Sequence, residues 1–479
     1  MSPFAAEVAA CRAAQQHWAA LSVRERLKPV RELRHLLVER ADEIYAAIAA
    51  DIRRPSVEVL ATELLPTTAA LKYLEQDAKR LLKPRRIAGR FRPTWLLGSR
   101  DAVHRRPWGV VGIIGTWNYP VYLNAVQVAQ ATTAGNGVLW KPSENVPRTA
   151  DLTHQLFRDA GFPTDLFVKL PATREAGPEL AEADIDHVVF TGSDAVGRKL
   201  AAKLGERLVP STLELSGCDA MFVLEDADPV RAAHAAWFGV TLNHGQTCIA
   251  VRRIFVHRSK CEAFVDVLKP LIAGAKPMSL VTAGQQSQFE RVIADAVERG
   301  GTALRGDGTV TPTFLVNAAP EMAVCREASF APVAAVIPFD NIDNALSLAA
   351  ACPFALAASV FTTDTRAAEQ LAPRIPAGSV TVNDVLAPTA HPATPFGGRG
   401  SSGWGVTQGA EGLLAMSTPQ VVTVRRGKFR PHIDETVKPD PESTADILGG
   451  LLRATHGRGW REWFRGVRHL LRGVRRKKK

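Results

Sequence analysis

The chain has 479 residues, of which 46% are hydrophobic and 22% charged, a composition typical of a globular protein with a sizeable core. Its six cysteines include no C-x-x-C spacing, which argues against a zinc ribbon or a disulfide framework. No apolar run is long enough to cross a bilayer, and the start of the chain lacks the pattern of a secretion signal, so a cytoplasmic protein is expected.

The net charge of +11 is concentrated at the C-terminal end. Residues 453–479 contain eleven Lys and Arg residues and one acid, Glu462, and therefore carry +10, which leaves +1 for residues 1–452. A nearly neutral body gives no electrostatic reason to expect a nucleic-acid partner. The basic character belongs to a tail.

Helices are predicted first along the chain, and alternating strands and helices follow. Residues 4–83 are rich in Ala, Leu, Glu and Arg and are predicted to be helical, with an interruption at Pro55. From about residue 107, short β-rich runs alternate with segments of helix length. The first series of runs covers residues 110–115, 137–141, 166–170 and 187–190.

A second series of the same kind follows residue 214. Its runs cover residues 221–224, 252–257, 333–338, 357–361 and 380–383. Strands that alternate with helices imply parallel sheets with right-handed crossovers, so the sequence predicts an α/β protein with two successive open-sheet domains. Residues 419–424 are predicted to form a late strand, and residues 429–442 a linker rich in Pro and charge.

One cysteine has the surroundings of a nucleophile. Cys248 closes the segment Asn-His-Gly-Gln-Thr-Cys, and Glu214, which precedes a tight Ser-Gly turn, lies 34 residues upstream. A reactive thiolate needs a base, and this carboxylate could supply one. The alternative is that Cys248 is a small buried hydrophobe, which is the usual fate of a free cysteine.

Three further motifs place polar groups at the ends of predicted strands. Asn118 in Trp-Asn-Tyr-Pro could donate its amide to an oxyanion, although an Asx turn is the alternative. Lys141 and Glu144 in Lys-Pro-Ser-Glu could bind ribose hydroxyls or form a solvated ion pair. The segment Phe-Thr-Gly-Ser-Asp-Ala-Val-Gly at 190–197 opens a helix and suits a phosphate.

Together with Pro-Phe-Gly-Gly at 395–398, these motifs resemble those of the NAD(P)-dependent aldehyde dehydrogenases. The resemblance runs from the first helices to Val424, and the Lys-Pro-Ser-Glu motif is most similar to the class-3-like, often dimeric branch. It implies that Cys248 is the nucleophile, that Glu214 is the base that activates water, and that Asn118 stabilises the oxyanion.

The resemblance also implies a cofactor, NAD, with NADP possible, and no metal. The residues implied in cofactor binding are Trp117, Lys141, Ser143, Glu144, Thr191, Gly192, Ser193, Val196, Leu215 and Phe330. The residues implied in the substrate pocket are Tyr119, Thr247, Ile249 and Phe396. A carboxylate at Glu144 should repel a 2′-phosphate, which favours NAD.

The implied organisation and activity follow the family. Residues 1–213 would form the NAD(P)-binding domain, with an oligomerisation segment near 84–106, residues 214–395 the catalytic domain, and residues 396–428 a return segment with an oligomerisation strand. A homodimer or tetramer would oxidise an aldehyde to an acid through a thiohemiacetal and a thioester. Acylation of CoA, or a degenerate enzyme kept as a scaffold, are the alternatives.

Two stretches depart from the family pattern, and in one of them the usual Glu-Leu-Gly-Gly-Lys becomes Glu-Leu-Ser-Gly-Cys at residues 214–218, which keeps the base but not the lysine. The usual Glu-x-Phe-Gly-Pro, whose glutamate grips the nicotinamide ribose, is replaced by Ala-Ser-Phe-Ala-Pro, so that Ala328 stands in the place of the glutamate. Glu327 lies one residue early. The nicotinamide end of the cofactor is therefore expected to be held more loosely, or by Glu327.

The tail, residues 443–479, carries an amphipathic pattern. Its large apolar residues share one face of a predicted helix, with arginines on the other faces; they are Trp460, Trp463, Phe464, Val467, Leu470, Leu471 and Val474. Ser443 and Asp446 are predicted to cap a preceding apolar turn. A basic amphipathic helix suits an anionic membrane surface, which would favour lipophilic aldehydes as substrates. A protein partner, a solvated tail and nucleic acid are the alternatives.

Overall fold

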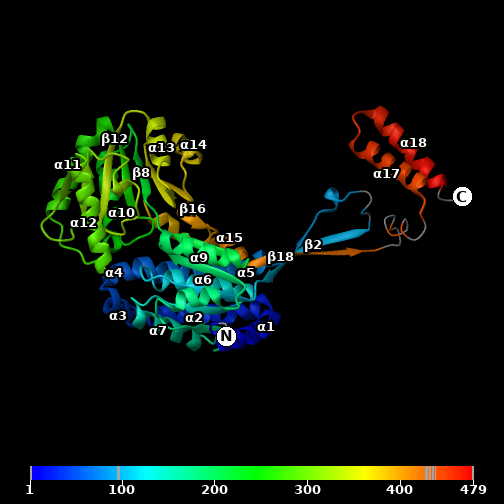
Figure 1. Ribbon diagram of the computed structural model, residues 1–479, viewed down its shortest axis with the longest axis horizontal. Coiled ribbons are helices and arrows are strands. Elements are labelled where there is room, and N and C mark those ends of the chain that lie inside the picture. The colour runs from blue at the N-terminus through cyan, green and yellow to red at the C-terminus, as the bar shows by residue number, and fades with distance from the viewer. Residues whose placement is uncertain are drawn as a thin grey trace. The chain divides into compact units, whose positions relative to one another are not determined.

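The computed structural model describes residues 3–93, 96, 98–426, 430, 433, 436 and 439–476, and these form two compact units (Figure 1). The larger unit consists of residues 1–83 and 105–418, and the smaller one of residues 84–104 and 419–479. No helix among the described residues is long and apolar enough to cross a membrane.

The larger unit begins with helices, as predicted for residues 4–83. They are α1 (Ala5–Ala20), α2 (Val23–Glu39), α3 (Ala41–Ile52), α4 (Ser56–Val59), a π-helical turn η1 (Leu60–Leu64) and α5 (Leu65–Leu81). A capping box formed by Ser22 and Glu25 begins α2. Figure 1 shows α2 and α5 beside a later helix, α6 (Tyr122–Ala134), and their apolar faces form one core with the first sheet.

The first sheet has six strands in the order β17-β7-β6-β3-β4-β5, and only β17 is antiparallel to its neighbour. Its strands are β3 (Val110–Ile114), β4 (Gly137–Lys141), β5 (Phe167–Lys169), β6 (His187–Gly192), β7 (Ser211–Leu215) and β17 (Gly403–Trp404). Its further helices are α7 (Pro147–Asp159), α8 (Ala176–Glu182) and α9 (Asp194–Glu206). The register places Ile114 beside Lys141, and Thr191 beside Glu214. The predicted motifs therefore meet at the carboxyl edge of this sheet, where open α/β sheets bind ligands.

The second sheet has seven strands in the order β10-β11-β12-β9-β8-β14-β15, and β10 is antiparallel to β11. Its strands are β8 (Asp219–Val223), β9 (Val251–His257), β10 (Thr302–Arg305), β11 (Thr313–Val316), β12 (Val333–Phe339), β14 (Ala357–Phe361) and β15 (Ser379–Val382). Its helices are α10 (Pro229–Thr241), α11 (Cys261–Ala273), α12 (Ala283–Glu298), α13 (Ile342–Ala350) and α14 (Thr365–Leu371). Two mostly parallel sheets confirm the predicted fold class, whereas β10 and β11 were not predicted.

The segment after residue 395 returns to the first sheet. There β17 pairs with β7, with Gly403 opposite Glu214, and α15 (Gly409–Ala415) follows. Gly403 has φ 97°, and a Cβ on it would lie 2.0 Å from the Leu213 carbonyl oxygen, so only glycine fits this close approach. The predicted domain boundary between residues 213 and 214 falls inside β7, because Glu214 belongs to a strand of the first sheet. A small two-stranded sheet pairs β13 (Phe354–Ala355) with β16 (Arg399–Gly400).

The smaller unit contains a three-stranded sheet and a helical hairpin. The sheet has the order β1-β2-β18, with β1 (Arg85–Arg86), β2 (Ser99–Pro107) and β18 (Ser417–Arg425), and β18 contains the strand predicted at 419–424. The hairpin consists of α17 (Pro441–His456) and α18 (Trp460–Arg476). Half of the residues of the linker predicted at 429–442 lie outside the described residues, and its last two residues belong to α17.

The cap predicted for the first tail helix is wrong. The carboxylate of Asp440, not a side chain at Ser443, accepts the backbone N–H of residue 443 at 3.2 Å and caps α17. Ser443 lies inside the helix, and its hydroxyl donates to the Gly473 carbonyl at 2.7 Å. Asp446 faces α18, where its carboxylate lies 3.0 Å from His469. The two residues therefore join the helices of the hairpin to each other.

Candidate active site

Cys248 lies in a turn between α10 and β9. Asn243 and His244 adopt left-handed backbone conformations, with φ 52° and 56°, and let the chain reverse after α10. Gly245 approaches the backbone of Ala331 so closely that a Cβ would lie 2.4 Å from it. The cysteine thus follows the C-terminus of α10, an end of a helix that does not favour a thiolate.

The surroundings of Cys248 keep its thiol protonated. Burial, and then the nearby carboxylates of Glu214 and Asp219, raise the pKa of Cys248 to about 12, although the backbone N–H groups of Cys248 and Ile249 favour the thiolate. At neutral pH the thiol therefore has to lose its proton as it attacks, and because this proton can pass to solvent water, the attack does not require Glu214 as its base.

Asn118 is fixed beside the cysteine by its own hydrogen bonds. Its side chain is 2% exposed; its amide nitrogen donates to the Gln246 carbonyl at 3.1 Å, and its amide oxygen accepts from the Thr116 hydroxyl at 2.7 Å. One amide hydrogen remains for another acceptor. Asn118 and Cys248 line the same cavity, so this hydrogen can reach an oxyanion formed there.

Glu214 lines that cavity too and is 3% exposed. One carboxylate oxygen accepts from the Thr407 hydroxyl at 2.7 Å, while the other is buried without a hydrogen-bond partner among the described residues. Burial raises the pKa of Glu214 to about 7, and the hydrogen bonds from Thr407 only partly oppose this. A carboxylate that titrates near neutral pH, with one oxygen free, has the properties of a general base.

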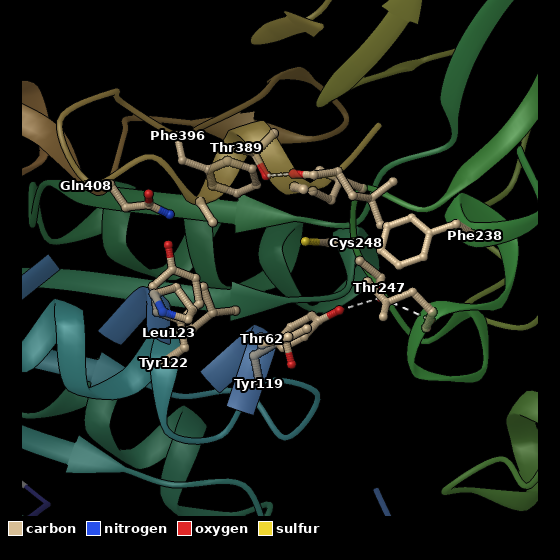
Figure 2. A pocket seen from close by; sticks show the side chains of 17 residues that line it. Thr62, Tyr119, Tyr122, Leu123, Phe238, Thr247, Cys248, Thr389, Phe396 and Gln408 are labelled. Carbon is tan, nitrogen blue, oxygen red and sulfur yellow. Dashed lines mark hydrogen bonds between the residues drawn. The ribbon is translucent and has the colours of Figure 1, made fainter. Parts of the chain in front are cut away.

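An apolar cavity reaches Cys248 from one side (Figure 2). The sulfur points into it, and the rings of Tyr119, Phe238 and Phe396 surround it. The Tyr119 hydroxyl is hydrogen-bonded to Thr247 at 2.7 Å, which removes polarity from the wall. No charged side chain is among the described residues that line this cavity. All four residues predicted for the substrate pocket line it: Tyr119, Thr247, Ile249 and Phe396.

A second, more polar cavity reaches Cys248 from the sheet edge. Six of the ten residues predicted to bind the cofactor line it: Trp117, Thr191, Gly192, Ser193, Leu215 and Phe330. The other four, Lys141, Ser143, Glu144 and Val196, do not line it. Lys141 ends β4 at the same sheet edge and donates to Glu144 at 3.1 Å, so the two residues do form an ion pair, but the Lys141 side chain is only 7% exposed and the pair is not the solvated one that was the alternative.

The residues at this edge fit a dinucleotide. Ser193 lines the cavity and caps α9 by accepting the N–H of Val196, and the N-terminus of a helix is a site where backbone N–H groups can bind a phosphate. Neither glycine of this segment has room for a side chain. A Cβ on Gly192, in the turn before α9, would lie 2.3 Å from the Phe190 ring, and a Cβ on Gly197, near the start of α9, would lie 2.5 Å from Leu215. The backbone can therefore approach a pyrophosphate closely.

The structure decides between the two expectations at residues 327 and 328. Ala328 lines the polar cavity, whereas Glu327 forms an ion pair with Arg291 of α12 and does not line the cavity. Glu327 is thus paired with Arg291, which argues against its taking the place of the missing glutamate. The amides of Gln285 and Gln288, also on α12, are the polar groups at this end of the cavity that the sequence did not reveal.

A buried ion pair that the sequence did not reveal supports the Asn118 loop. Arg54 and Glu63 are joined at 2.8 Å with side chains 1% and 0% exposed. The Arg54 guanidinium also donates to the Asn118 carbonyl and to the Asn243 side chain. Glu63 accepts the backbone N–H groups of residues 121 and 122 at 3.1 and 2.7 Å. The pair joins the N-terminal helices to both the Asn118 loop and the turn before Cys248.

Comparisons with known proteins agree with this geometry. The sequence profile of the Aldehyde dehydrogenase family matches residues 3–422. The chain is 34% identical to a 4,4′-diapolycopene aldehyde oxidase of Methylomonas sp over 414 residues, which is 84% of this chain and 78% of that protein. It is 32% identical to a probable coniferyl aldehyde dehydrogenase of Pseudomonas aeruginosa over 409 residues, 82% of this chain and 85% of that protein. The crystal structure of a Mycobacterium tuberculosis aldehyde dehydrogenase with NAD+ is similar with a TM-score of 0.82 and 29% identity, over 88% of this chain and 90% of that chain. The chain therefore belongs to the aldehyde dehydrogenase family.

Proposed function

We propose that this aldehyde dehydrogenase oxidises lipophilic aldehydes to carboxylic acids, with NAD+, or NADP+, as the hydride acceptor. One observation carries the proposal: Cys248 lies on the wall shared by an apolar cavity without charged lining residues and a polar cavity at the sheet edge. An aldehyde carbon at the sulfur would have its hydrocarbon part in the first cavity and its transferable hydrogen toward the second.

The roles of the residues follow from their positions. The Cys248 sulfur adds to the carbonyl carbon, and the Asn118 amide with the Cys248 backbone N–H stabilises the oxyanion. The polar cavity, lined by Trp117, Gly192 and Phe330, would hold a nicotinamide, which would supply the hydride acceptor and so leave a thioester on the Cys248 sulfur. Glu214 then takes a proton from water, the hydroxyl adds to the thioester carbon, and the acid leaves as Cys248 regains its proton.

The presence of Glu214 in the cavity supports hydrolysis over transfer to CoA. Transfer of the thioester to CoA does not require a base that activates water. The Glu214 carboxylate is buried, and one of its oxygens accepts no hydrogen bond from the described residues, so it is available to accept a proton from water. We also propose that the enzyme is a cytoplasmic homodimer or tetramer, held at an anionic membrane surface by residues 443–479, where lipophilic aldehydes accumulate.

Substrate class is tested by measuring NADH formation with a series of straight-chain aldehydes. Each CH₂ group buried in an apolar cavity contributes about 0.8 kcal/mol, so kcat/KM should rise about fourfold per added carbon until the cavity is full. The coniferyl and diapolycopene aldehydes named for two relatives extend the series. Succinic semialdehyde is the matched control, because its carboxylate would meet no cation among the described lining residues. A higher kcat/KM for that control than for hexanal would contradict the proposal.

Restoring a carboxylate at residue 328 should tighten cofactor binding. Ala328→Glu places an acceptor for ribose hydroxyls at a position that lines the polar cavity. A hydrogen bond to a charged group contributes about 1.5–3 kcal/mol, so the Kd for NAD+, measured by fluorescence titration, should fall about tenfold or more. Glu327→Gln is the control and should leave the Kd unchanged, because Glu327 is paired with Arg291. An unchanged Kd for Ala328→Glu would show that residue 328 does not face the ribose.

A further inference from the structure

The two tail helices contact each other through small residues. A Cβ on Gly450 would lie 2.6 Å from the backbone nitrogen of Leu470, and one on Gly466 would lie 2.5 Å from that of Ala454. A Cβ on Gly473 would meet the carbonyl oxygen of Ser443 at 2.7 Å, and the Ser443 hydroxyl donates back to the Gly473 carbonyl. The two helices are therefore held backbone to backbone, as small residues allow in closely packed helix pairs, and the contact uses none of the aromatic side chains.

This glycine seam leaves the large apolar side chains outside. Seven of them are exposed: Leu448 and Leu452 of α17, and Trp460, Trp463, Phe464, Leu471 and Val474 of α18. At about 100° per residue, the apolar residues of α18 occupy one continuous arc of about 120°. The leucines of α17 also share one face, since they lie four residues apart.

The ion pairs show on which side of the seam these faces lie. The three acids of the two helices, Glu442, Asp446 and Glu462, all face the partner helix from one flank, where they bind Arg476, His469 and Arg453 at 2.9, 3.0 and 2.7 Å. In both helices the exposed apolar residues are turned to the other flank, by about 80° or more from these acids. Because the helices are antiparallel, the two apolar stripes fall on the same side and form a single face.

A row of arginines borders this face on α18. Five arginines of α18 lie in the sector of the helix directly next to the apolar arc: Arg461, Arg465, Arg468, Arg472 and Arg475. Residues 441–476 contain eight arginines and three acids. The Arg461 guanidinium lies over the Trp460 ring, 5.5 Å from its centroid, as at a boundary between apolar and charged surroundings. Nucleic acid would complement this charge but not the apolar face.

We propose that α17 and α18 form a two-helix element that lies in the surface of an anionic membrane, with the single apolar face in the acyl layer and the arginine row at the headgroups. The charge of the row is complementary to anionic lipid, and tryptophans at the edge of an apolar face suit the interface. This inference rests on the proposed function, because membrane binding would bring the enzyme to the surface where lipophilic aldehydes accumulate. It makes α17 part of the binding surface and not a spacer.

Co-sedimentation of the full chain with vesicles tests this. Vesicles of phosphatidylcholine alone are compared at low salt with vesicles that also contain phosphatidylglycerol. The variants are Trp463→Ser for the α18 side and Leu448→Ser with Leu452→Ser for the α17 side. Leu208→Ser is the matched control, since Leu208 is 90% exposed in the larger unit. NADH formation from a water-soluble aldehyde without vesicles tests the proposed function separately and should be the same in all variants.

The unchanged chain should bind the anionic vesicles and lose this binding at high salt. Both tail variants should lower the partition coefficient about tenfold or more, and the control should not. Full binding by the Leu448 and Leu452 variant would overturn the two-helix face and leave α18 as the binding helix. Failure of the unchanged chain to bind anionic vesicles would overturn the membrane as the partner, in favour of a protein, whatever the result of the NADH assay.

Discussion

Cys248→Ala should abolish aldehyde oxidation, whereas Glu214→Gln should stop it after a single turnover. Without the sulfur no thiohemiacetal forms, so no hydride is released. With the amide in place of the carboxylate, the thioester forms but water is not activated, because only hydrolysis needs the base. Rapid-mixing absorbance of NADH distinguishes the two: no burst for Cys248→Ala, and a burst of about one NADH per active site for Glu214→Gln. Continued turnover by Glu214→Gln would contradict the role given to Glu214.

The pH dependence of hydrolysis is the internal control for this assignment. Burial raises the pKa of Glu214 to about 7, so below that pH the carboxyl group is protonated and cannot accept a proton from water. The single-turnover hydrolysis rate should therefore fall about tenfold per unit as pH decreases below 7, and level off above it. The residual rate of Glu214→Gln should lack this dependence. Thr407→Val removes a hydrogen bond that favours the carboxylate and should move the midpoint to higher pH.

Arg54→Met should destabilise the larger unit by about 3–5 kcal/mol, because it leaves the carboxylate of Glu63 buried without its charge partner. The free energy of unfolding, from urea titration, measures this. Arg31→Met is the matched control: Arg31 also pairs with a glutamate, Glu75, but is 67% exposed, and its loss should cost less than about 1 kcal/mol.

Adding Glu63→Gln to Arg54→Met should recover part of the lost stability, since the buried charge is then gone. It should not recover the reaction rate, because the Asn118 carbonyl and Asn243 still lack the guanidinium that positions them. A change in stability below about 1 kcal/mol for Arg54→Met would show that this pair is not needed to hold the loop.

The sequence predicted what is local or strongly patterned. The runs at β3, β4, β8 and β9 are buried throughout or nearly so, and such continuous apolar runs are the strongest signal of a parallel sheet. By contrast, β10 is a four-residue, partly exposed edge strand and has no such run. The motifs around Cys248 and Glu214 could be recognised because each carries its chemistry in neighbouring residues.

Contacts between distant residues could not be predicted in this way. Thr407, whose hydroxyl donates a hydrogen bond to Glu214, lies 193 residues after Glu214 in a segment without a distinctive pattern. Arg54 and Glu63 look like ordinary charged residues of a helical segment, and only the fold encloses them. In the tail, the apolar stripe of α18 could be predicted from its spacing, but the glycine seam that combines it with α17 needed the second helix in place.

The position of Cys248 after the end of a helix, partly buried and near the carboxylates of Glu214 and Asp219, has a consequence for the enzyme between turnovers. Peroxide attacks thiolates and spares thiols. Because burial and the neighbouring carboxylates raise the pKa of Cys248 to about 12, the thiol form prevails at pH 7 while no substrate is bound. A resting cysteine kept in the thiol form is therefore expected to be oxidised to a sulfenic acid only slowly.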